Sequence, residues 1–382
     1  MTEVMVVDSV RAPIGRYGGQ WADLAPETLG APLIAAILTR NAVPATQVDA
    51  LLLGNVVGGG GNVARRVGLS SALPVTTPAL TVDQQCASGL TAVSLAAAQI
   101  AAGQADLLLA GGVESTSRAP WKIARPARLY GAAPQILPRA PLGTAATGDP
   151  DMGVACDQLA KRLGISRAAQ DQYAFASQQK YQAASSAGVF APEIVPINDI
   201  DTDESPRPTT TLQRLAQLPP AFVPDGTVTA GNACPLNDGA GLCLLASRDY
   251  CRQNGLAARF VVAGQAAVGV APAEFALGPV HAVAKLLAQT GLTLADISRI
   301  ELNEAFAAQA LACLQQGGWP AARVNVSGGA LAFGHPFGAT GAILLRRLMT
   351  ELTRAGGRYG IVTMCVGGGQ GVALLLRQEV AA

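Results

Sequence analysis

The sequence predicts an α/β fold that is made of two similar halves. Apolar strand-like runs alternate with helical patterns through most of the 382 residues, which is typical of this fold class. The order of elements also repeats. Residues 102–115 read as a helix end, a glycine turn, an apolar strand and a Gly-rich loop, and residues 355–371 repeat that order. Self-similarity of this kind indicates an internal duplication.

A segment of different character separates the two halves. Pro and Arg are frequent in residues 118–139, and residues 199–214 are strongly polar. The apolar run at 237–247 then reads as a strand that returns to the first half. We therefore expect a first half at 1–117 plus 237–256, an inserted loop domain at 118–236 and a second half at 257–382.

Individual elements follow from the local pattern in chain order. Short apolar runs between turn residues predict strands at 4–7, 50–53, 79–82, 106–109, 260–263, 299–302, 323–326 and 360–364. Apolar residues at helical spacing predict helices at 28–40, 89–102, 166–184, 280–289, 306–316 and 338–355. Ser166 stands where its hydroxyl can cap the third of these helices.

The composition restricts the classes of function. Half of the residues are hydrophobic and only 14% are charged, where about 25% is typical, so part of the surface is expected to be buried against other subunits. The formal net charge is +1 and no basic run occurs, which argues against nucleic-acid binding. Residues 86–105 carry no charge but are mostly Ala, Gly, Ser, Thr and Gln, which favours a buried helix over a membrane span.

Cysteine usage points to a reducing compartment. The seven cysteines are an odd number, no CxxC pair occurs, and the chain enters a strand-like run almost at once instead of a secretory signal. A disulfide framework is therefore not expected, and a cytoplasmic location fits. Cys and His spacings typical of a metal site are also lacking, so no metal and no tightly bound cofactor are expected.

Cys86 is the first candidate for chemistry. It lies where the run at 79–82 meets the start of a long helix of small residues. Unpaired backbone N–H groups at a helix start favour a thiolate over a thiol, and they can also hold a developing oxyanion. The alternative is a buried structural cysteine, because free Cys is among the most buried residue types.

The two histidines stand in different settings. His335 is bracketed by glycines in a loop between a predicted strand and a predicted helix. That setting suits a side chain presented at a loop tip, and the alternative is a His packed in a turn. His281 stands at a helix start, where a structural role is favoured.

Two further candidates stand at predicted strand ends. Cys365 precedes a glycine-rich loop, but neither GxGxxG nor GxxxxGK[ST] occurs, so phosphate binding is poorly supported and a buried thiol is the alternative. Asn303 ends a strand where open α/β sheets place their sites, although an Asn there serves as often as a helix cap. If these loops converge, two thiols, an imidazole and an amide suit covalent acyl transfer with proton shuttling.

The motifs around these residues are similar to those of the thiolases, that is, the acyl-CoA acetyltransferases and 3-ketoacyl-CoA thiolases. In the family's order, and over essentially the whole chain, they are CASGL at Cys86, GGVES at Gly111, VTAGNA at Val228, NEAFAAQ at Asn303, GHPFGATG at Gly334 and CVGGGQG at Cys365. The resemblance implies the five-layered (αβαβα) thiolase fold, with two βαβαβαββ-like halves and a loop domain inserted in the first. It also implies a homodimer or homotetramer.

The resemblance further implies a role for each candidate. Cys86 would be the nucleophile that carries the acyl group, His335 would keep it activated, and Cys365 would move a proton on and off the α-carbon. Asn303 would orient a water that, with His335, stabilises an enolate oxygen. The backbone N–H groups of Cys86 and Gly367 would hold the oxygen of the tetrahedral intermediate. Coenzyme A and its thioesters are then substrates and products.

Positions that line the acyl or pantetheine tunnel are implied less directly, at Met152, Phe222, Ala230, Leu236, Ala305 and Phe306. Two departures from the family pattern fall beside them. Asp151 stands where short-chain biosynthetic members carry a His, and Cys234 followed by Pro235 replaces a serine near the pantetheine. Either change is expected to alter the acyl chain accepted or to weaken CoA binding.

Two other functions are compatible with the same fold. One is an acyl-CoA or lipid-binding protein without turnover, which the presence of all four catalytic matches disfavours. The other is a transferase that condenses CoA or carrier-protein esters without the second cysteine, and Cys365 argues against it.

Overall fold

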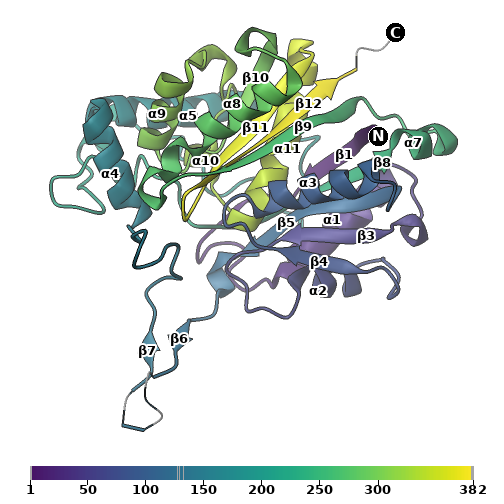
Figure 1. The fold of residues 1–382 in the computed structure, drawn as a ribbon, viewed down its shortest axis with the longest axis horizontal. Coiled ribbons are helices and arrows are strands. Elements are labelled where there is room, and N and C mark those ends of the chain that lie inside the picture. Colours follow the sequence, from purple (N-terminus) through teal and green to yellow (C-terminus); the bar gives the residue numbers. More distant parts are fainter. Residues whose placement is uncertain (1, 127, 129, 132, 380–382) are drawn as a thin grey trace.

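Helices and strands alternate along the chain in a computed structural model that describes residues 2–126, 128, 130–131 and 133–379 (Figure 1). The strands are β1 (Val4–Arg11), β2 (Gly15–Arg16), β3 (Ala50–Gly54), β4 (Ala79–Val82), β5 (Leu107–Ser115), β6 (Ile123–Ala124), β7 (Gln135–Ile136), β8 (Asn237–Ser247), β9 (Phe260–Gly269), β10 (Ile297–Leu302), β11 (Tyr359–Val366) and β12 (Gln370–Gln378). The helices are α1 (Pro26–Arg40), α2 (Val63–Leu69), α3 (Ser88–Ala101), α4 (Met152–Leu163), α5 (Arg167–Ser186), α6 (Leu212–Ala216), α7 (Arg248–Asn254), α8 (Gly278–Thr290), α9 (Ala307–Gly317), α10 (Ala330–Phe333) and α11 (Phe337–Ala355).

A ten-stranded mixed sheet carries the fold. Its order is β10-β11-β12-β9-β1-β8-β5-β3-β4, with β2 paired to β8. The series β1-β8-β5-β3 and the series β9-β12-β11-β10 have the same pattern, which is two antiparallel pairings followed by a parallel one. The two series meet where β1 pairs with β9. The predicted duplication is therefore confirmed as a repeated strand order.

The sheet is bent into two blocks with helices between and outside them. Helices α3 and α11 contact each other and lie between the blocks, while α1 and α2 cover the outer face of the first block and α8 and α9 that of the second (Figure 1). A helix enclosed on both sides must present small or apolar residues all round, and α3 is accordingly rich in Ala, Gly and Ser. The result is a stack of five alternating layers.

Backbones approach very closely where the two central helices begin. A Cβ atom added to Gly112 in β5 would lie 1.8 Å from the carbonyl oxygen of Gly338 in α11, and one added to Gly89 in α3 would lie 2.5 Å from the same oxygen. Only glycine leaves room for such contacts. The starts of both central helices are thereby fixed against the end of β5.

The strand predicted at 323–326 is wrong. Residues Ala321–Arg323 form a single 3₁₀ turn, and only Val324 bridges to Ile300 of β10. The reason is Asn325, which has φ 45° and turns the chain away. Its side chain accepts from the N–H of Leu302 and donates to the C=O of Leu302, both at 2.8 Å, so an amide side chain replaces the strand pairing.

Other differences concern the extent of predicted elements and elements that were not predicted, among them α2 and α7. The segment from Gly111 to Ser115, read as a loop from its glycines, continues β5, and β12 was not predicted after the glycines at 367–369.

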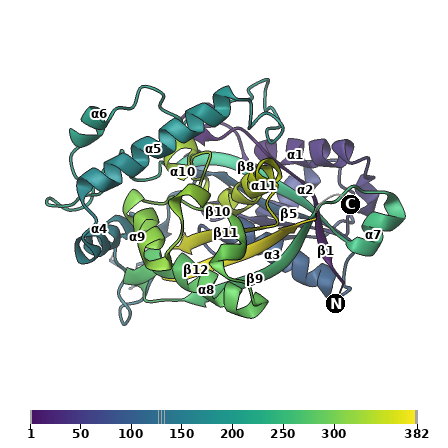
Figure 2. The same cartoon turned by 90° about the horizontal axis from the view of Figure 1, so that it is seen from above.

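The helix predicted at 166–184 is α5, and Ser166 caps it by accepting from the N–H of Ala169 at 3.2 Å. Helix α5 lies beside α9 and α10 (Figure 2).

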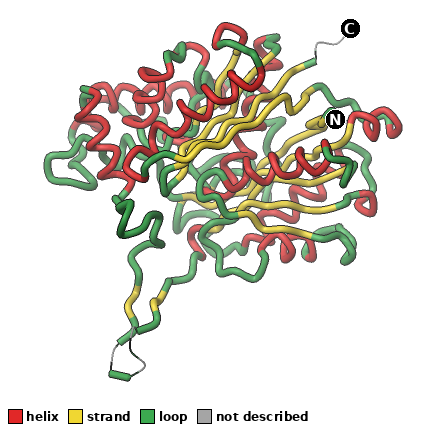
Figure 3. The backbone as a smooth tube through the Cα atoms, in the orientation of Figure 1, coloured by secondary structure: helices red, strands yellow, loops and turns green. Residues whose placement is uncertain are grey.

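The inserted segment contains more structure than the one helix predicted there. It adds α4 and α6, and its first part forms the hairpin β6–β7, which extends away from the body (Figure 3). The boundaries predicted at 117, 237 and 257 stay a prediction. Within the described residues, every helix is too short or too polar to span a bilayer.

Candidate active site

Four predicted catalytic side chains are buried at one end of the molecule. Cys86 stands two residues before α3 and His335 two residues before α11, while Asn303 follows β10 and Cys365 lies near the end of β11. Carboxyl ends of strands and the starts of the helices that follow them share one edge in an α/β sheet, which is where ligand sites form. The duplicated topology thus brings residues from both halves together.

A strained turn presents Cys86. The preceding Gln85 has φ 49°, in the left-handed region that non-glycine residues rarely adopt. Ser88 holds this turn, because its hydroxyl accepts from the N–H of Gln84 at 2.8 Å and donates to the C=O of Gln85 at 2.6 Å. Backbone strain that neighbouring groups maintain in this way is concentrated at functional sites.

Burial has the largest effect on Cys86 and raises its pKa to about 11, while the backbone N–H groups of Gly367 and of Cys86 itself lower it. The charges of Glu114 and Asp83 raise it further. The N–H groups thus favour the thiolate, as expected, but burial outweighs them in the resting protein. Cys86 is a thiol near neutral pH and needs a base.

His335 has the protonation state of a base. Its Nδ1 lies 2.7 Å from the hydroxyl of Thr340, and that hydroxyl donates its only hydrogen to the C=O of Pro336 at 2.8 Å. Nδ1 must therefore be the donor, which leaves Nε2 with a free lone pair that accepts from Asn303 Nδ2 at 3.2 Å. Burial lowers the pKa of His335 to about 3, so the ring is neutral.

Asn303 offers an acceptor inside the site. While its Nδ2 faces His335, its Oδ1 is buried and accepts no hydrogen bond from the described residues. A buried amide oxygen without a partner is costly unless a donor from solvent or substrate reaches it. The position of Asn303 is fixed by its N–H, which donates to the C=O of Thr363 at 3.0 Å.

Cys365 belongs to an apolar cluster with Cys156, Ala305 and Phe306, and Met152 and Cys234 pack against it. Burial raises the pKa of Cys365 well above its usual value, and the nearby Cys86 and Cys234 raise it further. Phe222 joins the cluster edge-on to Phe306, with ring centroids 6.1 Å apart. Most of the residues predicted to line the substrate tunnel are thus gathered beside Cys365.

The remaining predicted substrate positions lie differently. Ala230 is exposed, and Leu236 is 48% exposed although its backbone forms a bridge with His335. The carboxylate of Asp151 accepts from the N–H of Gly153 at 3.0 Å and so caps α4.

Three residues of the site were not singled out from the sequence. Thr340 stands in the first turn of α11, five residues after His335. A hydroxyl at that spacing is the sequence feature that could have identified it as a partner of the imidazole. Glu114 in β5 is buried and influences Cys86. The side chain of Leu142 lies 3.1 Å from a Cβ atom added to Gly367. No pattern in the sequence around Leu142 indicated that it belongs to the site.

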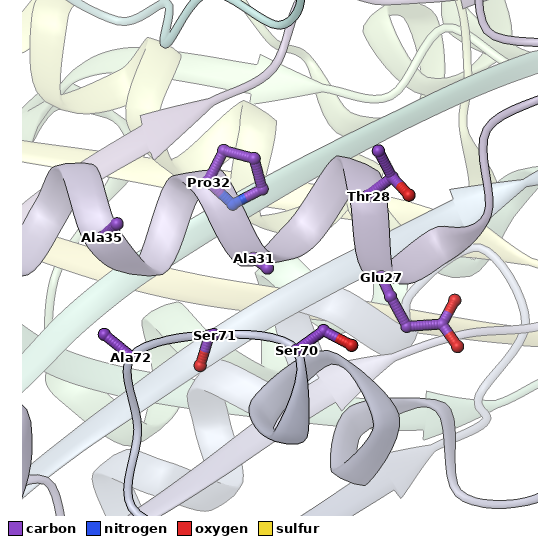
Figure 4. A pocket seen from close by; sticks show the side chains of 8 residues that line it. All are labelled: Glu27, Thr28, Ala31, Pro32, Ala35, Ser70, Ser71 and Ala72. Carbon is purple, nitrogen blue, oxygen red and sulfur yellow. The ribbon is translucent and has the colours of Figure 1, made fainter.

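A surface hollow of about 460 Å³ lies elsewhere. Its lining comes from α1 and from the turn after α2 (Figure 4). Side chains of Ala and Ser dominate it, and its one acid, Glu27, is paired with Arg66. None of its eight labelled residues is a predicted site residue.

A buried thiol and a neutral imidazole at one edge of the sheet, with backbone N–H groups beside the sulfur, are the groups that a covalent acyl-transfer site needs. Comparison with known proteins agrees with this class. Residues 4–249 match the family "Thiolase, N-terminal domain" and residues 256–378 match "Thiolase, C-terminal domain". The chain belongs to the thiolase family, and it is an acyltransferase.

Relatives with established names cover the whole chain. A beta-ketoadipyl-CoA thiolase of Acinetobacter baylyi is 42% identical over 99% of this chain and 100% of its own length. An acetyl-CoA acetyltransferase of Pseudomonas aeruginosa is also 42% identical with the same coverage. The crystal structure of the Bacillus anthracis acetyl-CoA acetyltransferase has a TM-score of 0.94 at 34% identity, covering 99% of both chains. These similarities confirm the thiolase fold and thiolase-type chemistry on acyl-CoA.

Proposed function

We propose that this chain catalyses the reversible Claisen condensation and thiolytic cleavage of 3-ketoacyl-CoA through an acyl group carried on Cys86. The observation that carries this proposal is the setting of the Cys86 sulfur, which is a buried thiol that two backbone N–H groups address. The neutral imidazole of His335 is expected at the same edge of the sheet, where its Nε2 contacts Asn303. These groups supply a nucleophile, oxyanion donors and a base.

In the condensing direction, His335 Nε2 takes the proton of Cys86, and the thiolate attacks the carbonyl carbon of acetyl-CoA. The N–H groups of Cys86 and Gly367 stabilise the oxyanion. Its collapse expels the CoA thiolate, which leaves with the proton from His335. His335 next takes the thiol proton of Cys365, the Cys365 thiolate removes an α-proton from a second acetyl-CoA, and the enolate attacks acyl-Cys86. The new carbon–carbon bond forms, the carbon–sulfur bond to Cys86 breaks, and the Cys86 thiolate takes the proton back from His335.

Mass spectrometry of the intact protein tests the covalent step. Incubation with acetyl-CoA should add one acetyl group to the wild-type chain and none to Cys86→Ala. Cys251→Ala is the matched control, because Cys251 lies in α7 and packs in the core outside the first block. An unmodified wild-type chain, or an adduct that persists without Cys86, would contradict the proposal.

For the substrate, we infer an acyl chain without a terminal carboxylate. The cluster beside Cys365 is formed by Met152, Cys156, Phe306 and their apolar neighbours. The ionisable groups that influence Cys156 and Cys234 are the acids Asp157 and Glu304 and other thiols. A terminal carboxylate placed there would be buried without a partner, at a cost of several kcal/mol.

Thiolysis with free CoA across 3-ketoacyl-CoA substrates tests this inference. Acetoacetyl-CoA should be cleaved with a kcat/KM at least about 10²-fold above that for 3-ketoadipyl-CoA, since each 1.4 kcal/mol is a factor of ten. The reverse order would refute the inferred chain. Tight CoA binding without thiolysis of any chain would instead favour the binding-protein alternative.

For assembly, we propose that two copies associate through β4. This strand ends the sheet, so one side of it is unpaired, and Leu80 on it is 48% exposed. Unpaired apolar edges are templates for strand addition, and a second copy of the same edge can pair with it. Light scattering should find a dimer or tetramer that Leu80→Lys dissociates, while Leu212→Lys on α6 has no effect. A monomeric wild type would refute this.

A cytoplasmic location is the last part of the proposal. It rests on the seven cysteines, which are all free thiols in the structure. Free thiols persist in reducing compartments. Cell fractionation of the native host, with the chain recovered in the periplasmic or secreted fraction, would contradict it.

A further inference from the structure

Glu114 is a buried carboxylate that the proposed steps leave unused. It lies near the end of β5 in the motif GGVES and is 0% exposed. A carboxyl group without contact to water is costly unless donors surround it. The Glu114 carboxylate is therefore expected to be surrounded by hydrogen-bond donors.

Four donors reach this carboxylate from two other elements. The side chain of Asn55 donates at 2.9 Å, and the N–H groups of Val56 and Val57, in the loop after β3, donate at 3.0 and 3.2 Å. The fourth donor is the N–H of Gly338, in the first turn of α11, at 2.9 Å. Glu114 thus joins three chain segments at one point.

The first turn of α11 also determines where His335 lies. His335 precedes that helix by two residues, and Thr340 in the same turn fixes the imidazole through Nδ1. The same turn touches the start of α3, because the Gly338 carbonyl lies 2.5 Å from a Cβ added to Gly89. A shift of this turn would move the imidazole relative to the thiol of Cys86.

Glu114 also acts on Cys86 through its charge. Burial raises the pKa of Glu114 to about 7, while the N–H groups of Gly338, Val57 and Val56 lower it, so the carboxylate is ionised above neutral pH. Its charge and that of Asp83 raise the pKa of Cys86. Cys234 and Cys365 are further ionisable groups near Cys86, and His335 is the base of the same site.

We propose that Glu114 is a positioning residue that holds the start of α11, and with it His335, in register with Cys86, and that its negative charge disfavours the Cys86 thiolate. This inference rests on the proposed function. It assigns the acid of GGVES a role in the geometry and the charge of the site.

Two readouts on folded protein test it. One is the single-turnover rate of acetyl transfer from acetyl-CoA to Cys86, and the other is the pH profile of Cys86 alkylation by iodoacetamide. In Glu114→Gln, an amide group faces four donors, so the turn should shift and acetyl transfer should slow by about 10²-fold, the effect of a misplacement of about 1 Å. Because the negative charge is gone, the alkylation profile should move to lower pH.

Glu114→Asp separates the two effects. It keeps the charge but shortens the reach, so acetyl transfer should slow while the alkylation profile stays at the wild-type pH. Asp249→Asn, an equal loss of charge at an exposed position in α7, should change neither readout.

A wild-type acetyl-transfer rate in folded Glu114→Gln, or an unmoved alkylation profile, would overturn the inference. Should that variant not fold, Asn55→Ala removes one of the four donors and should still slow acetyl transfer; an unchanged rate would be equally decisive. Failure of the proposed function is distinct from these outcomes, since the wild-type chain itself would then take no acetyl group.

Discussion

Replacing Thr340 by Val removes the hydroxyl that orients His335 while keeping the side-chain size. The hydroxyl accepts from His335 Nδ1 at 2.7 Å, and both residues are buried. Without it the Nδ1–H is an unsatisfied buried donor, which costs about 1–3 kcal/mol. The ring can avoid this cost by moving its proton to Nε2, but it then has no lone pair to take the proton of Cys86.

The expected consequence is a slower first step. The tautomer of His335 that carries its proton on Nδ1 should be destabilised by about 2 kcal/mol. This corresponds to a roughly 30-fold loss in the rate of Cys86 acetylation. The assay is rapid-quench mass spectrometry of the wild type, Thr340→Val and Thr340→Ser, the last of which keeps the hydroxyl and should remain within a few-fold of the wild type. Thermal unfolding of each variant checks the fold. A folded Thr340→Val that acetylates at the wild-type rate would refute the assigned tautomer.

Three further predictions concern stability. Burial lowers the pKa of His335 from 6.5 to about 3. Between about pH 6.5 and pH 3 the unfolded chain therefore binds a proton that the folded chain does not. The unfolding free energy should fall by about 1.4 kcal/mol for each pH unit lost in this range. Urea titrations at several pH values should show this part of the slope and its loss in His335→Gln; equal slopes would contradict it. Asp151→Ala should cost about 1 kcal/mol by removing the cap of α4, and Asp151→Asn much less. Two equally destabilised variants would mean that charge matters more than capping. Gly112→Ala should prevent folding or abolish acetylation, because its Cβ would lie 1.8 Å from the Gly338 oxygen, whereas Gly103→Ala, with φ 69° and open space, should cost only about 1 kcal/mol. A folded, active Gly112→Ala would show that the helix starts can separate.

Much of the fold, and the placement of the candidate catalytic residues at element ends, could be predicted from the sequence. Apolar runs locate the strands, and motif residues such as Cys86, His335 and Asn303 stand at element ends that the repeated topology brings to one edge. Local pattern was sufficient where the neighbour along the chain decides the outcome, as for the Ser166 cap.

Outcomes that depend on distant segments could not be predicted in this way. The pKa of Cys86 is decided by burial under residues far away in sequence, which outweighs the local N–H groups. The strand expected at 323–326 is lost because one amide side chain, that of Asn325, satisfies the backbone of Leu302. The donors to Glu114 come from residues 57 to 224 positions away, and no pattern along the chain reveals them.

The repeated strand order has a consequence for how the site could arise. Positions that correspond in the two halves by topology all lie at this one edge, and they form the pairs Cys86 and His335, Asn55 and Asn303, and Glu114 and Cys365. Two identical half-chains in a symmetric pair would place the same side chain at both members of each pair. In one fused chain each member can differ, so that the proposed nucleophile, Cys86, can stand where the other half holds the proposed base, His335. The repeated strand order thus supplies paired positions, and the difference between the members of each pair supplies the chemistry proposed here.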